Sequence, residues 1–188
     1  MFDTSPQPLD VRSLIGEFCP PGSRTFDILM RHGDLVAEKA LAAANRVAHL
    51  KPDREFLLEA AYLHDIGIMG THTPELGCQG TDPYLRHGVI GRGMLEAAGM
   101  PRHALVCERH VGVGITAEEI RNRRLPLPER DMAPVSLEEQ IVCYADKFFS
   151  KDGQRIAVKR TAKDVRNHLA RFGPHQVAIF DRWHSTFG

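Results

Sequence analysis

Hydrophobic residues recur along the chain at the three- and four-residue steps that are typical of an amphipathic helix. Between Arg24 and Leu50 they form one stripe, made of Leu29, His32, Val36, Ala40 and Val47. Lys51-Pro52 interrupts this pattern, and a second apolar helix is expected to begin at Asp53, a residue type that caps helix N-termini. This second helix leads into His64-Asp65, and Gly67 is its expected C-terminal stop.

The same periodicity predicts helices through most of the remaining chain. Thr116-x-x-Glu119 and Ser136-x-x-Glu139 match the capping box, in which each side chain satisfies a backbone donor of the other residue. Alternation typical of strands is nearly absent, so we expect an all-α fold. The later helices are expected at His87 to about Ala98, Pro101 to about Val111, Ser136 through Asp146, Thr161 to Arg171, and His175 to Phe187.

Two segments lack helical periodicity. Residues 1–22 are rich in proline and are interpreted as an extended lead-in to a single compact domain over residues 23–188. Ile68 to Arg86 is rich in Gly, Thr and Pro and is expected to be a loop. Loops of this length in compact domains often form lids or binding segments, so this one is expected to influence substrate choice.

The composition excludes several classes of protein. The 188 residues are 43% hydrophobic and 26% charged, and Lys+Arg balance Asp+Glu at 24 each. This gives no basic field for nucleic acid, and we expect no nucleic-acid partner. No apolar run approaches the ~20 residues that span a bilayer, so no membrane association is expected. The four cysteines form no CxxC pair, which favours reduced thiols and a cytoplasmic location.

The main candidate for chemistry is the tetrapeptide His64-Asp65-Ile66-Gly67 at the end of an apolar helix. An adjacent imidazole and carboxylate can both bind zinc, iron or manganese. An ionised Asp65 beside an apolar helix would be costly unless it is paired or bound to metal. Four further candidate ligands lie elsewhere in the chain: His32, His87, His110 and Asp146.

Each of these residues also has a structural interpretation when taken alone. A histidine such as His32 on an apolar helix face is more often hydrogen-bonded than metal-bound. Asp146 could pair with Lys147 or Arg155. Gly33 costs about 1 kcal/mol relative to alanine inside a helix, which suggests that a neighbouring group approaches the backbone closely. Taken together, the order His, His-Asp, His, His, Asp favours a metal site.

This ordered set resembles the HD superfamily of metal-dependent phosphohydrolases, and in particular its HDIG-type members. The resemblance covers residues 24–150 and leaves the C-terminal helices, at 161–187, outside it. The matching stretches are Arg31-His32-Gly33, Leu63-His64-Asp65-Ile66-Gly67, His87-Gly88-Val89-Ile90-Gly91, Glu108-Arg109-His110-Val111-Gly112 and Tyr144-Ala145-Asp146-Lys147.

The resemblance implies two divalent metal ions, as in binuclear members such as the bacterial diadenosine tetraphosphatases. By that resemblance His32, His64 and Asp146 would hold one ion, His87 and His110 the other, and Asp65 would bridge them. Iron, manganese and zinc are all compatible with this set. Two such ions, about 3.5–4 Å apart, activate water for attack and neutralise phosphoryl oxygens. Cyclic-dinucleotide phosphodiesterases are disfavoured, because Ile68 stands where they carry lysine and their Gly-Tyr-Pro signature is missing.

A phosphate substrate would also need cationic neighbours. Lys147, Arg86, Arg92 and Arg109 lie nearest to the ligands in sequence. Lys147 is the preferred candidate for a catalytic and substrate-binding role, although a solvated surface lysine would look the same. Arg86 and His72 are further candidates for substrate contacts, and a solvated role is the alternative for His72.

The sequence therefore predicts a phosphohydrolase for a nucleotide or another small phosphate ester, with a homodimer as a candidate assembly. A mixed-valent di-iron oxygenase is the alternative enzyme, because a few HD proteins use the same ligand types for that chemistry. A regulatory module that binds a nucleotide without turnover is the third hypothesis. A complete ligand set counts against it, since binding alone needs no open binuclear centre.

Overall fold

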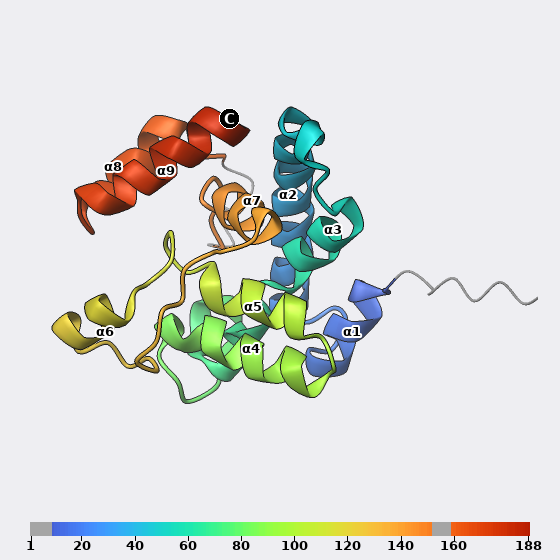
Figure 1. The fold of residues 1–188 in the computed structure, drawn as a ribbon. Helices are drawn as coiled ribbons and strands as arrows, with labels where there is room; N and C mark the ends of the chain where they lie inside the picture. Colours follow the sequence, from blue (N-terminus) through green and yellow to red (C-terminus); the bar gives the residue numbers. More distant parts are fainter. Residues whose placement is uncertain (1–8, 152–158) are drawn as a thin grey trace, which may run out of the picture.

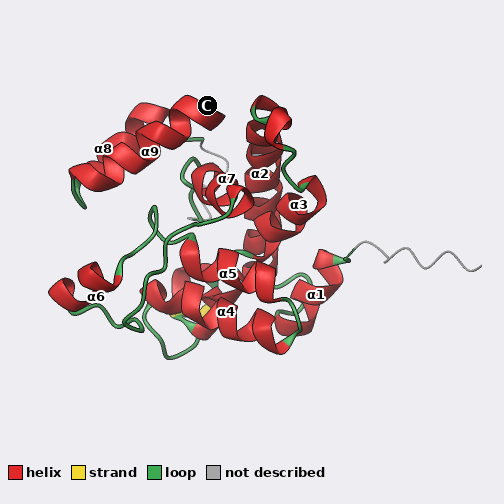
Figure 2. Cartoon of the chain, in the orientation of Figure 1, coloured by secondary structure: helices red, strands yellow, loops and turns green. Residues whose placement is uncertain are grey.

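The computed structural model describes residues 9–151 and 159–188, and within them the fold is helical (Figures 1 and 2). The predicted all-α class is confirmed, with only a minimal two-stranded sheet in the described residues. The helices are α1 (Val11–Phe18), α2 (Arg24–Arg46), α3 (Arg54–Leu63), α4 (His87–Ala97), α5 (Pro101–Arg109), α6 (Ala117–Arg123), α7 (Leu137–Asp146), α8 (Ala162–Ala170) and α9 (Pro174–Phe187). No described helix is both long and apolar enough to cross a bilayer.

The capping signals in the sequence place several helix starts correctly. The Asp53 side chain accepts a hydrogen bond from the Phe56 amide at the start of α3. Thr116 forms the complete capping box with Glu119 at the start of α6. At α7 only half of the expected box forms. The Ser136 hydroxyl accepts from the Glu139 amide, but the Glu139 carboxylate accepts from the Val135 amide and from Arg109.

Three expectations about local structure are wrong. The lead-in is not extended throughout, because α1 forms within it and buries Ile15 completely; residues 1–8 lie outside the described part. Gly67 does not end the second helix. That helix, α3, ends at Leu63, and Gly67 lies in a 3-10 turn, η2 (Ile66–Gly70). The segment Ile68 to Arg86 is not a plain loop, since it forms 3-10 turns and the antiparallel pair β1 (His72–Thr73) and β2 (Cys78–Gln79).

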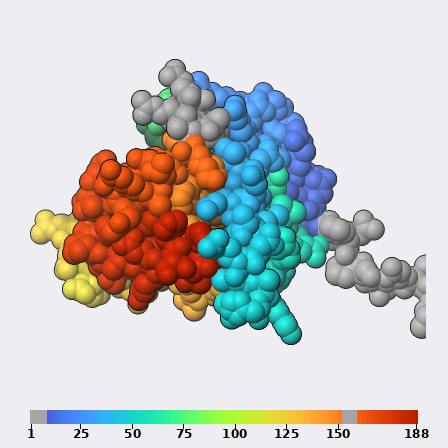
Figure 3. Space-filling model, turned by 90° about the horizontal axis from the view of Figure 1, so that it is seen from above, coloured from blue at the N-terminus to red at the C-terminus, as the bar shows by residue number. Residues whose placement is uncertain are grey.

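Two hydrophobic clusters make up the interior. One lies between the C-terminal half of α2 and helices α3, α7 and α9, and includes Val36, Leu57, Ile141 and Phe180. The other joins the N-terminal half of α2 to α1, η2, α4 and α5, and includes Phe26 and Leu95. Helix α9 lies beside α2 (Figure 3), and α8 contacts α9.

The junction between the two clusters contains the candidate ligands. On α2, His32 and Gly33 lie between Leu29 of one cluster and Val36 of the other. At the end of α3, Ala61 belongs to the first cluster and Leu63 to the second, and His64 and Asp65 follow directly. The packing of the helices therefore brings polar residues together at a buried position where the hydrophobic core is interrupted.

Candidate metal centre

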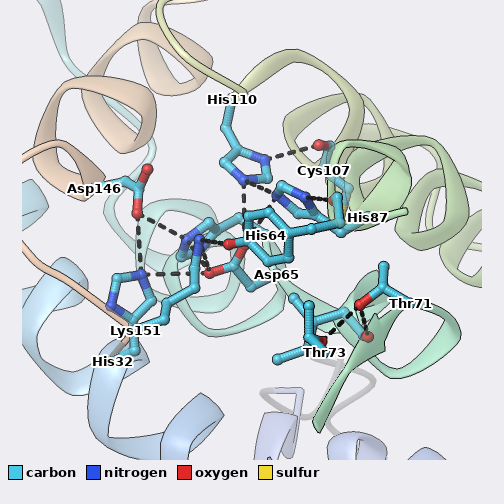
Figure 4. A network of polar contacts seen from close by, with 12 residues as sticks. His32, His64, Asp65, Thr71, Thr73, His87, Cys107, His110, Asp146 and Lys151 are labelled. Carbon is cyan, nitrogen blue, oxygen red and sulfur yellow. Dashed lines mark hydrogen bonds and ion pairs between the residues drawn. The ribbon is translucent and has the colours of Figure 1, made fainter. Parts of the chain in front are cut away.

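Six candidate ligands predicted from the sequence converge at this junction (Figure 4). They come from five helices or helix ends: His32 on α2, His64 and Asp65 after α3, His87 at the start of α4, His110 after α5, and Asp146 at the end of α7. All six residues are buried, with 1–7% of their surface exposed. A histidine-rich cluster this deeply buried needs either hydrogen-bond partners or a cation to offset its desolvation.

The first ligand set comprises His32, His64, Asp65 and Asp146. The Asp146 Oδ1 atom lies 3.0 Å from His32 Nε2 and 3.5 Å from His64 Nε2. The Asp65 Oδ2 atom lies 3.4 Å and 3.1 Å from the same two nitrogens. Metal–ligand bonds of about 2.0–2.2 Å place neighbouring ligand atoms roughly 3.0–3.5 Å apart, so these separations fit one shared ion.

The second ligand set comprises Asp65, His87 and His110. Here the other carboxylate oxygen of Asp65 is used, because Oδ1 lies 3.4 Å from His87 Nε2 and 3.2 Å from His110 Nε2. Asp65 thus turns one oxygen toward each ligand set. This is the arrangement expected of a carboxylate that bridges two ions.

Backbone carbonyls fix the orientation of three of the imidazoles. The Nδ1 atoms of His64, His87 and His110 lie 2.8, 2.7 and 2.7 Å from the carbonyl oxygens of Ala61, Tyr84 and Cys107. A carbonyl can only accept, so each Nδ1 carries the proton and each Nε2 can offer its lone pair to an ion. The Nε2 atoms of His87 and His110 face each other at 3.0 Å, where two lone pairs would repel unless a cation lies between them.

The electrostatics of the cluster also suit a cation. Burial, together with the neighbouring His110 and Lys151, lowers the pKa of His87 to about 3, which leaves the ring in its neutral, metal-binding form at pH 7. Burial also opposes a charge on His64, but Asp65 and Asp146 outweigh it and raise the pKa of His64 to about 9. The two carboxylates thus strongly favour a positive charge between themselves and this ring. The donor set therefore fits divalent metal ions.

Two lysines neutralise the carboxylates. Lys147 Nζ lies 2.8 Å from Asp146 Oδ2 and donates to the His110 carbonyl at 3.0 Å, so it is not a solvated surface lysine. Asp146 raises the pKa of Lys147 despite the burial of the ammonium. Lys151 Nζ lies 2.8 Å from Asp65 Oδ2 and donates to the Tyr84 hydroxyl at 3.0 Å. Asp146 therefore has the predicted partner Lys147, while Arg155 lies outside the described residues.

Two glycines allow the close packing that positions these ligands. A Cβ atom on Gly33 would lie 2.4 Å from Tyr62 Cδ1, which identifies the close neighbour expected from the sequence as the Tyr62 side chain. A Cβ atom on Gly67 would lie 2.0 Å from the His87 carbonyl oxygen and 2.3 Å from the Gly91 amide nitrogen. Gly67 therefore lets the turn that follows Asp65 contact the first turn of α4, where His87 begins the helix.

A cavity of about 1140 Å³ opens onto this centre. His87, His110, Asp146, Lys147 and Lys151 form one part of its lining. Further lining residues come from the hairpin segment (Thr73, Glu75, Leu76), from α6 (Glu119, Arg123) and from α8 (Val165, His168, Leu169). Helix α8 lies beyond the region in which the sequence suggested functional residues, so its contribution to the wall was not anticipated.

Several other sequence candidates have protein partners away from this lining. Arg86 contacts Asp82 and donates to the Pro126 carbonyl, and exposed His72 lies on β1. Arg92 and Arg130 both bind the buried carboxylate of Glu108, and Arg109 binds Glu139. Sequence reasoning missed Lys151, Tyr84 and the Glu108 cluster. Glu108 stands two residues before His110, and this adjacency was the one available signal.

Comparison with known proteins identifies the family. The model of the HD domain matches residues 24–150, which is more than half of the chain. The chain belongs to the HD domain family, and the resemblance to HD-type metal-dependent phosphohydrolases predicted from the sequence is confirmed. Among solved structures, the HD domain of the Listeria monocytogenes phosphodiesterase PgpH superposes with a TM-score of 0.51 at 15% identity, covering 93% of this chain and 94% of that one. At this identity the similarity describes the fold.

Three curated relatives are similar to this chain in sequence. An uncharacterized protein of Methanocaldococcus jannaschii is 35% identical over 73% of this chain and 72% of its own length. Proteins named tRNA (cytidine(56)-2'-O)-methyltransferase are 32% identical in Picrophilus torridus and 29% identical in Thermoplasma volcanium, over 67% and 85% of this chain. This chain spans only 33% and 43% of those two methyltransferases.

Proposed function

We propose that this protein is a metal-dependent phosphohydrolase with two divalent ions, acting on a nucleotide or another small phosphate ester. The observation that carries the proposal is the placement of Asp65, whose two oxygens face separate sets of ligands. Iron, manganese and zinc all suit imidazole and carboxylate donors. When bound, a pair of such ions activates water and neutralises the phosphoryl oxygens as charge develops.

The protein side chains have separable roles in this proposal. Asp65 shares its carboxylate between the two ligand sets and fixes their separation. Lys147 holds Asp146 through an ion pair and His110 through the carbonyl hydrogen bond, so it orients one ligand of each set. It also lines the cavity, where its charge favours an anionic substrate. We therefore keep Lys147 as a residue that supports catalysis mainly by positioning.

The charge of the site supports a phosphate substrate. Asp65 and Asp146 are each paired with a lysine, so these four groups together are close to neutral. Two divalent ions would make the centre strongly cationic, and a phosphoryl group supplies the matching negative charge. Arg24, Arg123 and Arg160 add positive charge to the cavity wall. A cavity of about 1140 Å³ has room for a ligand of nucleotide size.

The names of the two methyltransferases contribute nothing to this proposal, because the chain spans less than half of those proteins. The PgpH name is likewise not carried over, since 15% identity supports the fold alone.

The deciding experiment combines metal analysis with a phosphate-release screen. Protein purified anaerobically would be analysed for metal and then assayed with nucleotides, dinucleotides and sugar phosphates under iron, manganese or zinc. We expect hydrolysis, measured as inorganic phosphate or, for dinucleotides, as the nucleotide product, and we expect it to be abolished by a chelator and by Asp65→Ala. A variant of an exposed residue, Lys163→Met, is the control and should keep wild-type activity. Iron-dependent oxygen consumption with an organic substrate, and no hydrolysis of any ester, would favour the oxygenase instead.

A further inference from the structure

Only three of the six candidate ligands line the cavity. His87, His110 and Asp146 line it, whereas His32, His64 and Asp65 are outside its lining and only 1% exposed. Lys151 both lines the cavity and contacts Asp65. The Lys151 side chain thus contacts the Asp65 carboxylate and also lines the cavity, and Figure 4 shows it extending toward Asp65. A phosphoryl group that enters from the cavity would meet this ammonium next to the ligand sets.

Lys151 differs from Lys147 in the partners it holds. Lys147 donates to the main-chain carbonyl of His110, and that carbonyl can accept this hydrogen bond whether or not metal is bound. Lys151 contacts Asp65 Oδ2, the same oxygen that faces His32 and His64 in the first ligand set. An ion in that set would compete with the ammonium for this oxygen. An ammonium has three donors and no acceptor, so it cannot itself become a ligand.

Repulsion between bound metal ions and the Lys151 ammonium would favour an anion as the new partner of Lys151. With divalent ions in both ligand sets, the negative charge of Asp65 is shared with those ions, and the Lys151 ammonium is repelled by them. A phosphoryl oxygen that enters from the cavity would give Lys151 a new charge-assisted hydrogen bond. Such bonds are stronger than those between neutral groups and depend on direction, which suits the positioning of a substrate.

Tyr84 keeps Lys151 at this position. Its ring stacks on His87 with 4.6 Å between ring centroids and 26° between planes. Its hydroxyl accepts from Lys151 Nζ at 3.0 Å, and its carbonyl oxygen lies 2.7 Å from His87 Nδ1. Tyr84 is thus anchored to a ligand of the second set, and its phenol oxygen offers Lys151 a partner that does not depend on Asp65.

We infer that Lys151, held by Tyr84, binds a non-bridging oxygen of the substrate's phosphoryl group by exchanging Asp65 for that oxygen. This inference rests on the proposed function. It assigns the phosphate contact to a residue that contacts the bridging ligand, five positions after Asp146. Lys147 then retains its positioning role, because its two protein partners remain in place.

Binding of inorganic phosphate to the metal-loaded protein tests this assignment without relying on turnover. Calorimetric titration would compare wild type with Lys151→Met, Lys151→Arg and Tyr84→Phe. The matched control is Lys163→Met, because Lys163 is an exposed lysine outside the cavity lining. Loss of a hydrogen bond to a charged group corresponds to about ten-fold or greater weakening, so we expect that for Lys151→Met. Lys151→Arg should lose less because it keeps the charge, Tyr84→Phe should lose a few-fold, and Lys163→Met should match wild type.

A second measurement separates substrate binding from a purely structural role. Metal titration of the metal-free proteins should show that Lys151→Met keeps the wild-type stoichiometry and binds metal at least as tightly, because no ammonium competes for Asp65. Loss of metal by this variant would overturn the inference, as would unchanged phosphate affinity. If wild type binds no phosphate and hydrolyses no ester, the proposed function fails as well. If wild type does both and Lys151→Met behaves identically, only the assignment to Lys151 fails.

Discussion

At the scale of single residues, Asp65 joins the two ligand sets and should therefore control both metals. Asp65→Ala is expected to reduce bound metal from about two equivalents to nearly none, whereas His87→Ala should leave about one, because it belongs to the second set alone. Elemental analysis after gel filtration measures the stoichiometry. His103→Ala is the control, since His103 binds Glu59 away from the centre and its loss should leave the metal unchanged. Retention of two equivalents by His87→Ala would leave only a mononuclear site.

Substitution of Gly67 tests how closely the turn after Asp65 must approach α4. A methyl group at Gly67 would meet main-chain atoms of His87 and Gly91, which cannot rotate away, so Gly67→Ala should destabilise the fold by about 1–3 kcal/mol. Gly93, also on α4, is the matched control. A Cβ there has nothing within 4 Å, and Gly93→Ala should stabilise the helix by about 0.5–1 kcal/mol. Urea unfolding of the metal-free proteins measures both changes. Equal midpoints for Gly67→Ala and wild type would show that this contact is not tight.

The ligands were predictable from the sequence for a reason that does not extend to their neighbours. Histidine and aspartate are rare on the apolar faces of helices, so their order along the chain indicates a shared site. Lys151 gives no such signal, because a long flexible side chain can reach Asp65 from a position that no helical spacing marks. The partner of Arg92 was equally hidden, because Glu108 on α5 meets Arg92 only when α4 and α5 pack together.

At the scale of elements, the segment between Asp65 and His87 contributes to the cavity wall. Glu75, exposed in the 3-10 turn Pro74–Leu76, places a carboxylate on that wall, where it should repel an anionic substrate. Glu75→Gln should lower KM for a phosphate ester by roughly two- to five-fold at low salt and leave kcat nearly unchanged, because an exposed charge contributes up to about 1 kcal/mol. The effect should diminish as salt is added.

Glu118 supplies the matched control for that prediction. It is an exposed glutamate on α6 outside the cavity lining, so Glu118→Gln should have no effect on KM. A KM that stays at the wild-type value in Glu75→Gln, or that changes equally in both variants, would show that the hairpin segment does not face the bound substrate.

The boundaries of helices could be predicted from the sequence where a side chain caps the helix. The predicted boundaries were wrong where contacts with other elements determine where a helix ends. Asp53, Thr116 and Thr161 cap their helices as local chemistry dictates. Gly67 was misread because its lack of a side chain serves contact with α4 and not a helix C-terminus. The strands β1 and β2 have two residues each, too few for alternation to be visible. Helix α1 was missed because proline on either side suggested an extended chain.

At the scale of the whole molecule, the candidate metal centre lies where the two hydrophobic clusters meet, and no pattern within one helix could reveal this division. Helix α2 contributes Leu29 to one cluster and Val36 to the other, with His32 between them. The two ligand sets draw on α2, α3, α4, α5 and α7, so bound ions would cross-link both clusters. The stability of the entire domain should therefore depend on metal.

Metal removal should consequently lower the melting temperature of the whole protein in a single transition. Ions that bind only the native state stabilise it by about 4 kcal/mol at roughly a thousand times their Kd. For a domain of this size, about 2–4 °C per kcal/mol then predicts a drop of roughly 8–16 °C for each ion that chelation removes. Calorimetry with and without chelator, followed by readdition of manganese or zinc, measures the change and its reversal. Asp65→Ala should show no response to either treatment, because it lacks the shared ligand, whereas His103→Ala should respond as wild type does. A wild-type melting temperature that is indifferent to chelator, in protein shown to contain metal beforehand, would mean that the clusters hold together without the ions.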